Sequence, residues 1–315
     1  MTMDPSLPVK DLLALVDKTF GIERILLDKG RDIIAKYYAQ SGPAYEKIHS
    51  KQGCMHLALN SDGVFSAQGY RTQPKAILQE LKEMKATRAL ELGCGKGFNT
   101  LFVAQRFARG HCTATDLIEA HVAKARELAA EAGQANVTYE QASFEPLPDR
   151  YVGFDLVFAF ETLCYAQDTD LVAQSIAASL RPGGRFVMYD VHAWENADEL
   201  PKEMALITRL YEISMAVTHG FIRTGKWEAS LERAGLVVDQ TQDLAHDVQP
   251  GLKHLHDMGV KTLSDWKTRL AIKVMPPYMS RNAIAALFGP YVYRLAGQES
   301  RGVLTYQKIT ATKPK

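Results

Sequence analysis

The chain has 315 residues, which is enough to bury one large hydrophobic core or two modest ones. Its 37 basic and 36 acidic residues give a net charge of +1, so the chain lacks the overall excess of positive charge that is typical of proteins that bind nucleic acid or anionic membranes. This balance favours a small-molecule partner. The four cysteines, Cys54, Cys94, Cys112 and Cys164, have no C-x-x-C spacing, which argues against a disulfide framework and a structural zinc site and predicts reduced thiols in a cytoplasmic protein.

Residues 1–85 are mostly helical by hydrophobic period, with a polar, glycine-containing connection over residues 59–73. They include neither a basic region followed by an apolar one, as in a secretory signal, nor the ~18 continuous apolar residues of a membrane-spanning helix. We therefore expect a helical N-terminal segment and no second full domain. Any contact with a membrane is expected at its surface.

From residue 88 onward, apolar runs of strand length alternate with helical patterns. This alternation predicts βαβ units, a parallel sheet buried on both faces and a doubly wound α/β core over residues 86–192. The predicted strands cover residues 88–93, 111–116, 136–142, 154–160 and 185–191.

Residues 193–315 are expected to add a helical lid and the last strands. Helical patterns over 196–235 and 262–290 flank a strand at 236–244, and residues 303–313 are predicted to close the chain as an edge strand. The lid should cover the carboxyl ends of the strands, where open α/β sheets bind ligands. About half of its large apolar residues are expected in an ordinary core and the rest in an adaptable apolar pocket: Met204, Met215, Met275, Met279, Tyr278, Phe288 and Tyr291.

A glycine loop follows the first predicted strand, in the stretch "ELGCGKGFNT". Gly93, Gly95 and Gly97 suit a sharp turn that approaches a ligand closely, ahead of a helix N-terminus that can meet an anionic group. Lys96 is followed by Gly97 rather than by Ser or Thr, which disfavours a Walker loop, and the third glycine comes one position early for a dinucleotide fingerprint. Asp116, at the tip of the second strand, is placed to accept hydrogen bonds from both ribose hydroxyls of an adenosine group.

With Glu91 before this loop and Asp116 after it, the sequence resembles the class I S-adenosylmethionine-dependent methyltransferases. The resemblance implies a Rossmann-like, mostly parallel seven-stranded sheet and S-adenosyl-L-methionine as cofactor. It implies a carboxylate of the cofactor at the glycine loop, an amino group at Glu91 and a ribose at Asp116. The implied cofactor-binding residues are Tyr38, Glu91, Gly93, Cys94, Gly95, Gly97, Asp116, Leu117, Ser143, Phe144 and Glu161. Ser143 stands where the family usually has an Asp that contacts the adenine.

The stretch "FETLCYAQDTD" follows the fourth strand and resembles the branch that contains sterol and tocopherol C-methyltransferases. Glu161 is kept, but Tyr165 replaces the His that precedes Ala166 in that branch. A second resemblance to the same branch covers Tyr37, Tyr38, Tyr45 and His56, in a segment that folds over the cofactor. A helix cap for Glu161, and aromatic packing for any single tyrosine, are the alternatives.

The predicted catalytic residues are Glu161, Tyr165, Tyr45 and His192. An alkene acceptor would form a cation facing Glu161 or Tyr165, whereas a hydroxyl or amine acceptor needs a base. That base is Glu161 or a histidine, the candidates being His192, His246, His254 and His256. None of these histidines has metal-ligand spacing with a supporting acid, so we expect no metal.

The sequence thus predicts a methyltransferase of a small, largely apolar metabolite, with C-methylation of an isoprenoid or sterol-like acceptor favoured. O- or N-methylation of an aromatic or amine natural product is the first alternative. An NAD(P)-dependent oxidoreductase and a non-catalytic cofactor-binding module are alternatives of other classes. We expect no nucleic-acid partner and no transmembrane segment, and a homo-oligomer is possible.

Overall fold

Seven strands form one sheet in the order β3-β2-β1-β4-β5-β7-β6 in the computed structural model, which describes residues 8–27, 33–45, 49–50, 53–195, 200–293 and 302–315. The strands are β1 (Arg88–Leu92), β2 (His111–Asp116), β3 (Val137–Gln141), β4 (Phe154–Phe160), β5 (Leu180–Ala193), β6 (Val237–Asp243) and β7 (Leu304–Thr312). β1 to β5 pair in parallel and β7 is antiparallel to both of its neighbours. The doubly wound, mostly parallel sheet expected from the sequence is confirmed.

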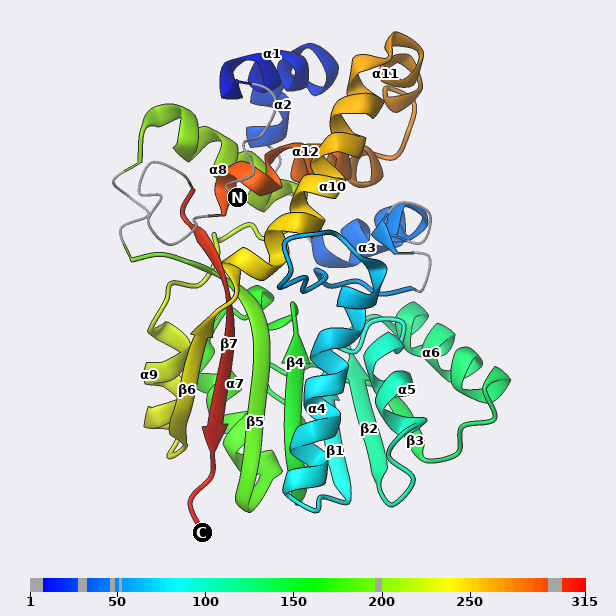
Figure 1. Ribbon diagram of the computed structural model, residues 1–315, viewed down its shortest axis with the longest axis vertical. Coiled ribbons are helices and arrows are strands. Elements are labelled where there is room, and N and C mark those ends of the chain that lie inside the picture. Colours follow the sequence, from blue (N-terminus) through cyan, green and yellow to red (C-terminus); the bar gives the residue numbers. More distant parts are fainter. Residues whose placement is uncertain (1–7, 28–32, 46–48, 51–52, 196–199, 294–301) are drawn as a thin grey trace.

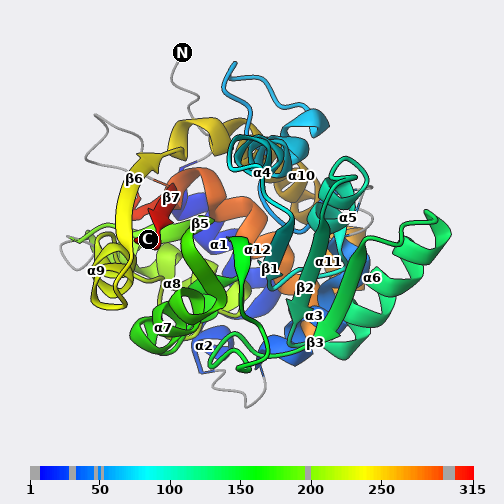
Figure 2. The same ribbon diagram turned by 90° about the horizontal axis from the view of Figure 1, so that it is seen from below.

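Helices cover both faces of this sheet. The helices are α1 (Val9–Phe20), α2 (Ile22–Leu26), α3 (Ile33–Ala44), α4 (Thr72–Glu83), α5 (Phe98–Ala104), α6 (Glu119–Glu131), α7 (Thr169–Ser179), α8 (Lys202–Ser214), α9 (Lys226–Arg233), α10 (Ala245–Ser264), α11 (Trp266–Ile272) and α12 (Pro277–Val292). Two short 3-10 helices are η2 (Ala67–Arg71) and η3 (Leu163–Tyr165). α4, α5 and α6 lie on one face and α7 and α9 on the other (Figure 2).

The burial of the central strand and the capping of α7 follow from their sequences. All seven residues of β4 are buried, as expected for a central parallel strand whose two faces are both covered by helices. α7 begins at Asp168, whose side chain accepts hydrogen bonds from the backbone N–H groups of Asp170 and Leu171. The β1–β4 boundary is the point where chain order reverses, so the crevice beyond the carboxyl ends of these two strands is the place where such sheets bind ligands.

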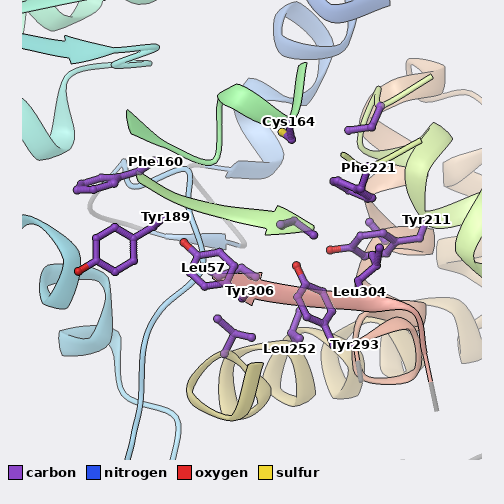
Figure 3. Packing of buried hydrophobic residues seen from close by; sticks show 14 of the residues in the cluster. Leu57, Phe160, Cys164, Tyr189, Tyr211, Phe221, Leu252, Tyr293, Leu304 and Tyr306 are labelled. Carbon is purple, nitrogen blue, oxygen red and sulfur yellow. The ribbon is translucent and has the colours of Figure 1, made fainter. Parts of the chain in front are cut away.

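The remaining helices gather beyond that end of the sheet (Figure 1). α12 packs against α10, α8 and α3, so segments from both halves of the chain form one helical layer over the strand ends. Buried side chains of β4, β5 and β7 continue the core into this layer, and Figure 3 shows Tyr306 of β7 among them, with Leu57, Tyr211 and Leu252.

Two expectations about the last third of the chain are wrong. The final strand β7 is not an edge strand: it lies between β5 and β6, and seven of its nine residues are buried. The edge is β6, where six of the seven residues are exposed, because its sequence VVDQTQD carries few groups to bury. The sequence pattern also predicts no helix for residues 245–261, yet α10 spans them although it contains Pro250. Tertiary packing against α12 overrides the local helix-breaking preference.

Candidate active site

The glycine loop between β1 and α5 has the tight geometry that its sequence predicts. Gly93, Gly95 and Gly97 have φ values of +65°, +53° and +84°, a region that side-chain-bearing residues rarely adopt. A Cβ atom at Gly93 would lie 2.0 Å from Oγ1 of Thr162, and one at Gly97 would lie 2.8 Å from Cβ of Ala125. The loop therefore follows neighbouring segments closely, and its glycines leave room that no other residue type would leave.

Asp116 connects this loop to β2. Its Oδ2 accepts a hydrogen bond from the N–H of Gly95 at 2.8 Å, and its Oδ1 accepts one from the N–H of Ile118 at 2.9 Å. An ionised carboxylate has about four lone-pair positions, so each oxygen can accept one more hydrogen bond. The side chain of His121 approaches Oδ1 to 3.4 Å, and the following residue, Leu117, is 56% exposed.

Glu91 lies beneath the loop and is 1% exposed. Its carboxylate accepts a hydrogen bond from the hydroxyl of Thr100 and one from Nδ2 of Asn99 at 3.3 Å, both on α5. Burial raises the pKa of Glu91 to about 8. The buried neighbour Cys94 donates its N–H to the carbonyl of Thr115 at 2.9 Å. Glu91 thus braces the helix that begins after the loop, and direct contact with a cofactor amino group stays a prediction.

The segment after β3 joins the segment after β4. Half-buried Ser143 accepts a hydrogen bond through Oγ from the N–H of Glu145 at 2.9 Å, with Phe144 between them. The carboxylate of Glu145 in turn accepts from the N–H of Gln167 at 2.9 Å. Since β3 and β4 flank β1 and β2, this link places Ser143 and Phe144 at the same edge of the sheet as Asp116.

Glu161 follows β4 directly and has a φ of +47°, which is uncommon for a residue other than glycine. Its Oε1 accepts the N–H of Leu57 at 2.6 Å, and the hydroxyl of Tyr306 on β7 also bonds its carboxylate. Burial raises the pKa of Glu161 to about 8 despite these donors. The carboxyl group is therefore largely protonated at neutral pH.

Four tyrosines connect α3 to the lid. The hydroxyls of Tyr37 and Tyr45 lie 2.8 Å apart, and those of Tyr38 and Tyr165 lie 3.1 Å apart. Tyr165 donates to the carbonyl of Met215 on the lid at 3.0 Å, and the Tyr38 ring meets the His121 ring edge-on at 5.1 Å. Tyr38, Tyr45 and Tyr165 therefore come together with Glu161 around one space, as the sequence predicts, and Tyr38 also reaches the neighbourhood of Asp116.

That space is a cavity of about 630 Å³ between the strand ends and the lid. It is bordered by Glu161, Cys164 and Tyr165 after β4 and by apolar side chains of α8, α10, α11 and α12. Of the seven lid residues that could have lined a pocket, Met215, Met275 and Met279 do so. The other four lie outside its lining: Met204, Tyr278, Phe288 and Tyr291. Among the described residues that border it there is no lysine or arginine.

The histidines are arranged differently from the expectation. His192 is fully buried within β5, with Nδ1 3.2 Å from the carbonyl of Asp190, and does not border the cavity. Nor do His246, His254 and His256 on α10, of which His256 is fully buried and lies 2.8 Å from the carbonyl of Leu287. His56 lies under the loop, 2.9 Å from Oδ1 of Asn99.

The histidine that does border the cavity is His49, which the sequence analysis missed. Its Nε2 lies 2.9 Å from the carbonyl oxygen of His56. A carbonyl can only accept, so Nε2 carries the proton and Nδ1 has a free lone pair. Burial lowers the pKa of His49 to about 4, so the ring is neutral at neutral pH. No spacing pattern marks this residue or Tyr306 in the sequence.

The described part of the chain offers neither a metal centre nor a membrane span. No group of three or more His, Cys, Asp or Glu side chains could hold a metal ion. No helix there combines the length and the apolar character that crossing a bilayer requires.

Comparison with known proteins identifies the core. Residues 83–235 match the family model described as "Methyltransferase domain". A curated relative, the S-adenosyl-L-methionine-dependent Diels-Alderase iccD of Talaromyces variabilis, is 27% identical over 229 residues, which are 69% of this chain and 77% of that protein.

Solved structures show the same fold. The cyclopropane synthase MmaA2 of Mycobacterium tuberculosis aligns with a TM-score of 0.72 at 11% identity, over 91% of this chain and 100% of that one. The geranyl diphosphate C-methyltransferase of Streptomyces coelicolor A3(2), in complex with Mg2+, geranyl diphosphate and S-adenosyl-L-homocysteine, aligns with a TM-score of 0.53 at 14% identity, over 99% and 100%. At these identities the likeness concerns the fold.

Proposed function

Because the chain is a class I S-adenosylmethionine-dependent methyltransferase, we propose that it methylates carbon in a small, neutral, apolar acceptor of the isoprenoid or sterol-like class. The observation that carries this proposal is the cavity beside Glu161: it is large, lined mainly by apolar side chains, and has no described lysine or arginine in its wall. A diphosphate buried there would find no cationic partner among the described lining residues, and an unpaired buried charge is strongly unfavourable. A neutral isoprenoid fits this wall better than its diphosphate.

The residues at the strand ends fit the cofactor. The backbone N–H groups that follow Gly97 at the start of α5 suit its carboxylate, and the two free lone-pair positions of Asp116 suit the ribose hydroxyls. We assign the adenine to Ser143 and Phe144, which follow β3 at the same end of the sheet as Cys94 after β1 and Leu117 after β2. Tyr38 reaches this site from α3, which supports the proposed role of residues 1–85 as a cover.

When bound, S-adenosylmethionine would supply an electrophilic methyl group for the acceptor, and its sulfur would keep the electron pair of the broken bond. The chain's own residues align the acceptor and exclude water. The rings and hydroxyls of Tyr45 and Tyr165 face the cavity and can stabilise positive charge there, each by about 0.5–2 kcal/mol.

A proton must then leave the methylated acceptor. Glu161 holds its own proton at neutral pH and its carboxyl group is engaged by Leu57 and Tyr306, so it is poorly suited to accept another. His49 is neutral and has a free lone pair on Nδ1. We therefore assign the proton to His49. Methylation of an alkene carbon leaves a carbocation on the neighbouring carbon. A weak base suffices, because a C–H bond next to a carbocation is strongly acidic.

The test is incubation with methyl-labelled S-adenosylmethionine and a panel of neutral isoprenoid alcohols, geranyl diphosphate, phenols and amines. We expect label on carbon in a neutral isoprenoid. Label only on oxygen or nitrogen would overturn the choice of C-methylation, and label only on the diphosphate would overturn the argument from the cavity wall.

A second candidate keeps the same cofactor and cavity but transfers no methyl group. It is a cyclisation of a polyene held in the cavity, favoured by the relative in Talaromyces variabilis that is named a Diels-Alderase. In this case the product has the mass of the substrate and no S-adenosylhomocysteine forms, so one mass-spectrometric assay separates the two candidates.

A further inference from the structure

Helix α11 presents a row of exposed apolar side chains. Trp266 and Leu270 lie one turn apart on the helix and are each 62% exposed. Val274, one further turn along the chain, is 86% exposed. Single exposed apolar residues are ordinary, but three of them at a four-residue spacing, two on α11 and one in the turn that follows it, place exposed apolar area within one short segment. α11 lies, with α1, at the end of the molecule opposite the C-terminus (Figure 1).

The opposite side of the same segment borders the cavity. Thr268 and Ile272 of α11 line it, as does Met275 just beyond. Among the lining residues that the structure describes, Met275 alone is more than a third exposed, at 39%. The cavity therefore approaches the surface at Met275, immediately beside the exposed apolar row.

Basic residues alternate with this row. Residues 261–275 contain four of them and a single acid: Lys261, Lys267, Arg269, Lys273 and Asp265. The acid is used within the chain, since Asp265 caps α11 by accepting from the N–H of Thr268 at 3.0 Å. Lys267 lies 5.9 Å from the Trp266 ring, so charge and aromatic surface are presented together. Tryptophan and leucine interleaved with lysine is the pattern of segments that lie in the interface of an anionic bilayer.

We propose that the α11 patch, defined as Trp266, Lys267, Leu270, Lys273, Val274 and Met275, docks on the surface of an anionic lipid bilayer. The apolar side chains enter the headgroup boundary while the lysines meet lipid phosphates. A second copy of the chain is a poorer occupant, because two such patches would bring like charges together. The position of Met275, which both lines the cavity and is exposed, also suits a bilayer, since an apolar acceptor that enters there would not cross water.

Docking rests on the proposed function in one respect, since it makes the bilayer the source of the apolar acceptor. Vesicle binding is measured without methyl transfer, so a failure of docking and a failure of the proposed function can be told apart. The full chain is mixed with vesicles of phosphatidylcholine alone or with about 30% phosphatidylglycerol. Trp266 is a built-in reporter, because Trp227 is 1% exposed and Trp194 is half-buried. We expect a blue shift of tryptophan fluorescence and co-sedimentation with the anionic vesicles, both weakened by salt.

Matched variants locate the contact. Lys267→Gln with Lys273→Gln should weaken binding about 30-fold, since each lysine near an anionic surface contributes about a fivefold factor. Leu270→Ser with Val274→Ser should remove the blue shift. The control for the lysine pair is Lys75→Gln with Lys82→Gln, two exposed lysines on α4. The control for the apolar pair is Val152→Ser with Val237→Ser, two exposed valines outside the α11 patch. Both controls should bind the vesicles as the wild type does.

The proposal is overturned if neither vesicle shifts the fluorescence, or if the patch variants and the controls bind equally. It is also overturned if sedimentation shows a dimer that Leu270→Ser with Val274→Ser dissociates, because the occupant would then be a second copy of this chain. Each variant must also have the circular dichroism spectrum of the wild type, so that a loss of binding is not caused by unfolding.

Discussion

Asp116 offers the sharpest test of the cofactor site, through the change Asp116→Asn. The carboxylate holds the N–H groups of Gly95 and Ile118 with one oxygen each, at 2.8 and 2.9 Å. The amide of asparagine keeps one of these acceptors and turns an NH₂ donor toward the other N–H group. The negative charge that would meet the ribose hydroxyls is lost as well.

The size of the effect follows from these bonds. A hydrogen bond to a charged group contributes about 1.5–3 kcal/mol, and the variant loses one toward the ribose and weakens the second. We expect a loss of about 2–3 kcal/mol in cofactor binding, or an increase in Kd of about 30- to 150-fold. Isothermal titration calorimetry with S-adenosylmethionine and S-adenosylhomocysteine measures it directly.

The matched control is Glu119→Gln. Glu119 lies three residues further along, carries the same charge and pairs with Arg126 at 3.0 Å, but its side chain is 53% exposed on α6. This change should leave Kd within about twofold, because an exposed ion pair contributes only about 0–1 kcal/mol. A folded Asp116→Asn variant with Kd within threefold of the wild type would refute the ribose assignment.

Four further changes test the rest of the site. Glu161→Gln should raise Tm at pH 8–9 and have less effect at pH 5. The pKa of Glu161 is about 8 in the folded protein and near 4.5 in the unfolded chain, so between these pH values the native state holds a proton that the unfolded chain has released. The stability of the wild type therefore falls as the pH rises from about 4.5 to about 8. Equal Tm differences at both pH values would contradict this. His49→Gln should lower kcat about 100- to 10,000-fold with cofactor Kd unchanged, and wild-type kcat/KM should fall only as pH drops toward 4, where His49 becomes protonated; a variant that retains its rate would exclude His49. Gly93→Ala should lower the free energy of unfolding, measured by chemical denaturation, far more than Gly63→Ala. Both glycines have positive φ, but a Cβ at Gly93 would lie 2.0 Å from Thr162, whereas nothing lies within 4 Å of a Cβ at Gly63. Similar decreases in the free energy of unfolding would show that the close approach to Thr162 is unimportant. Ala283→Phe should raise the acceptor KM at least about tenfold without altering cofactor Kd, since Ala283 lines the cavity, and an unchanged KM would place the acceptor elsewhere.

The sequence predicts the parts of this fold that depend on local pattern. The first five strands follow from apolar runs of strand length, and the glycine loop follows from residues that need positive φ. The position of β7 does not follow from pattern, because a strand is buried or exposed according to the partner that covers it. The alternation in residues 303–313 fits an edge and an interior position equally well.

The candidate site shows the same division. Glu161 and Tyr165 are predictable because strand ends mark where ligands bind. His49 and Tyr306 are not, since each acquires its importance from a neighbour far away in the sequence: the carbonyl of His56 fixes the tautomer of one ring, and Glu161 receives the hydroxyl of the other. α10 was missed for a related reason, as Pro250 argues locally against the helix that packing on α12 sustains.

The hydrogen bonds to Glu161 have a consequence for the order of events during synthesis. The donors come from Leu57, in the first fifth of the chain, and from Tyr306 on β7, which inserts between two strands made much earlier. A ribosome-bound chain that has not yet released β7 therefore lacks one hydrogen-bond donor to Glu161, which borders the cavity, and β5 and β6 lack the strand that joins them. Such long-range pairing is slow and leaves unpaired edges exposed while it is awaited. The carboxyl group of Glu161 therefore gains its Tyr306 donor only after the last strand has been synthesised, whereas all strands around the glycine loop are made much earlier.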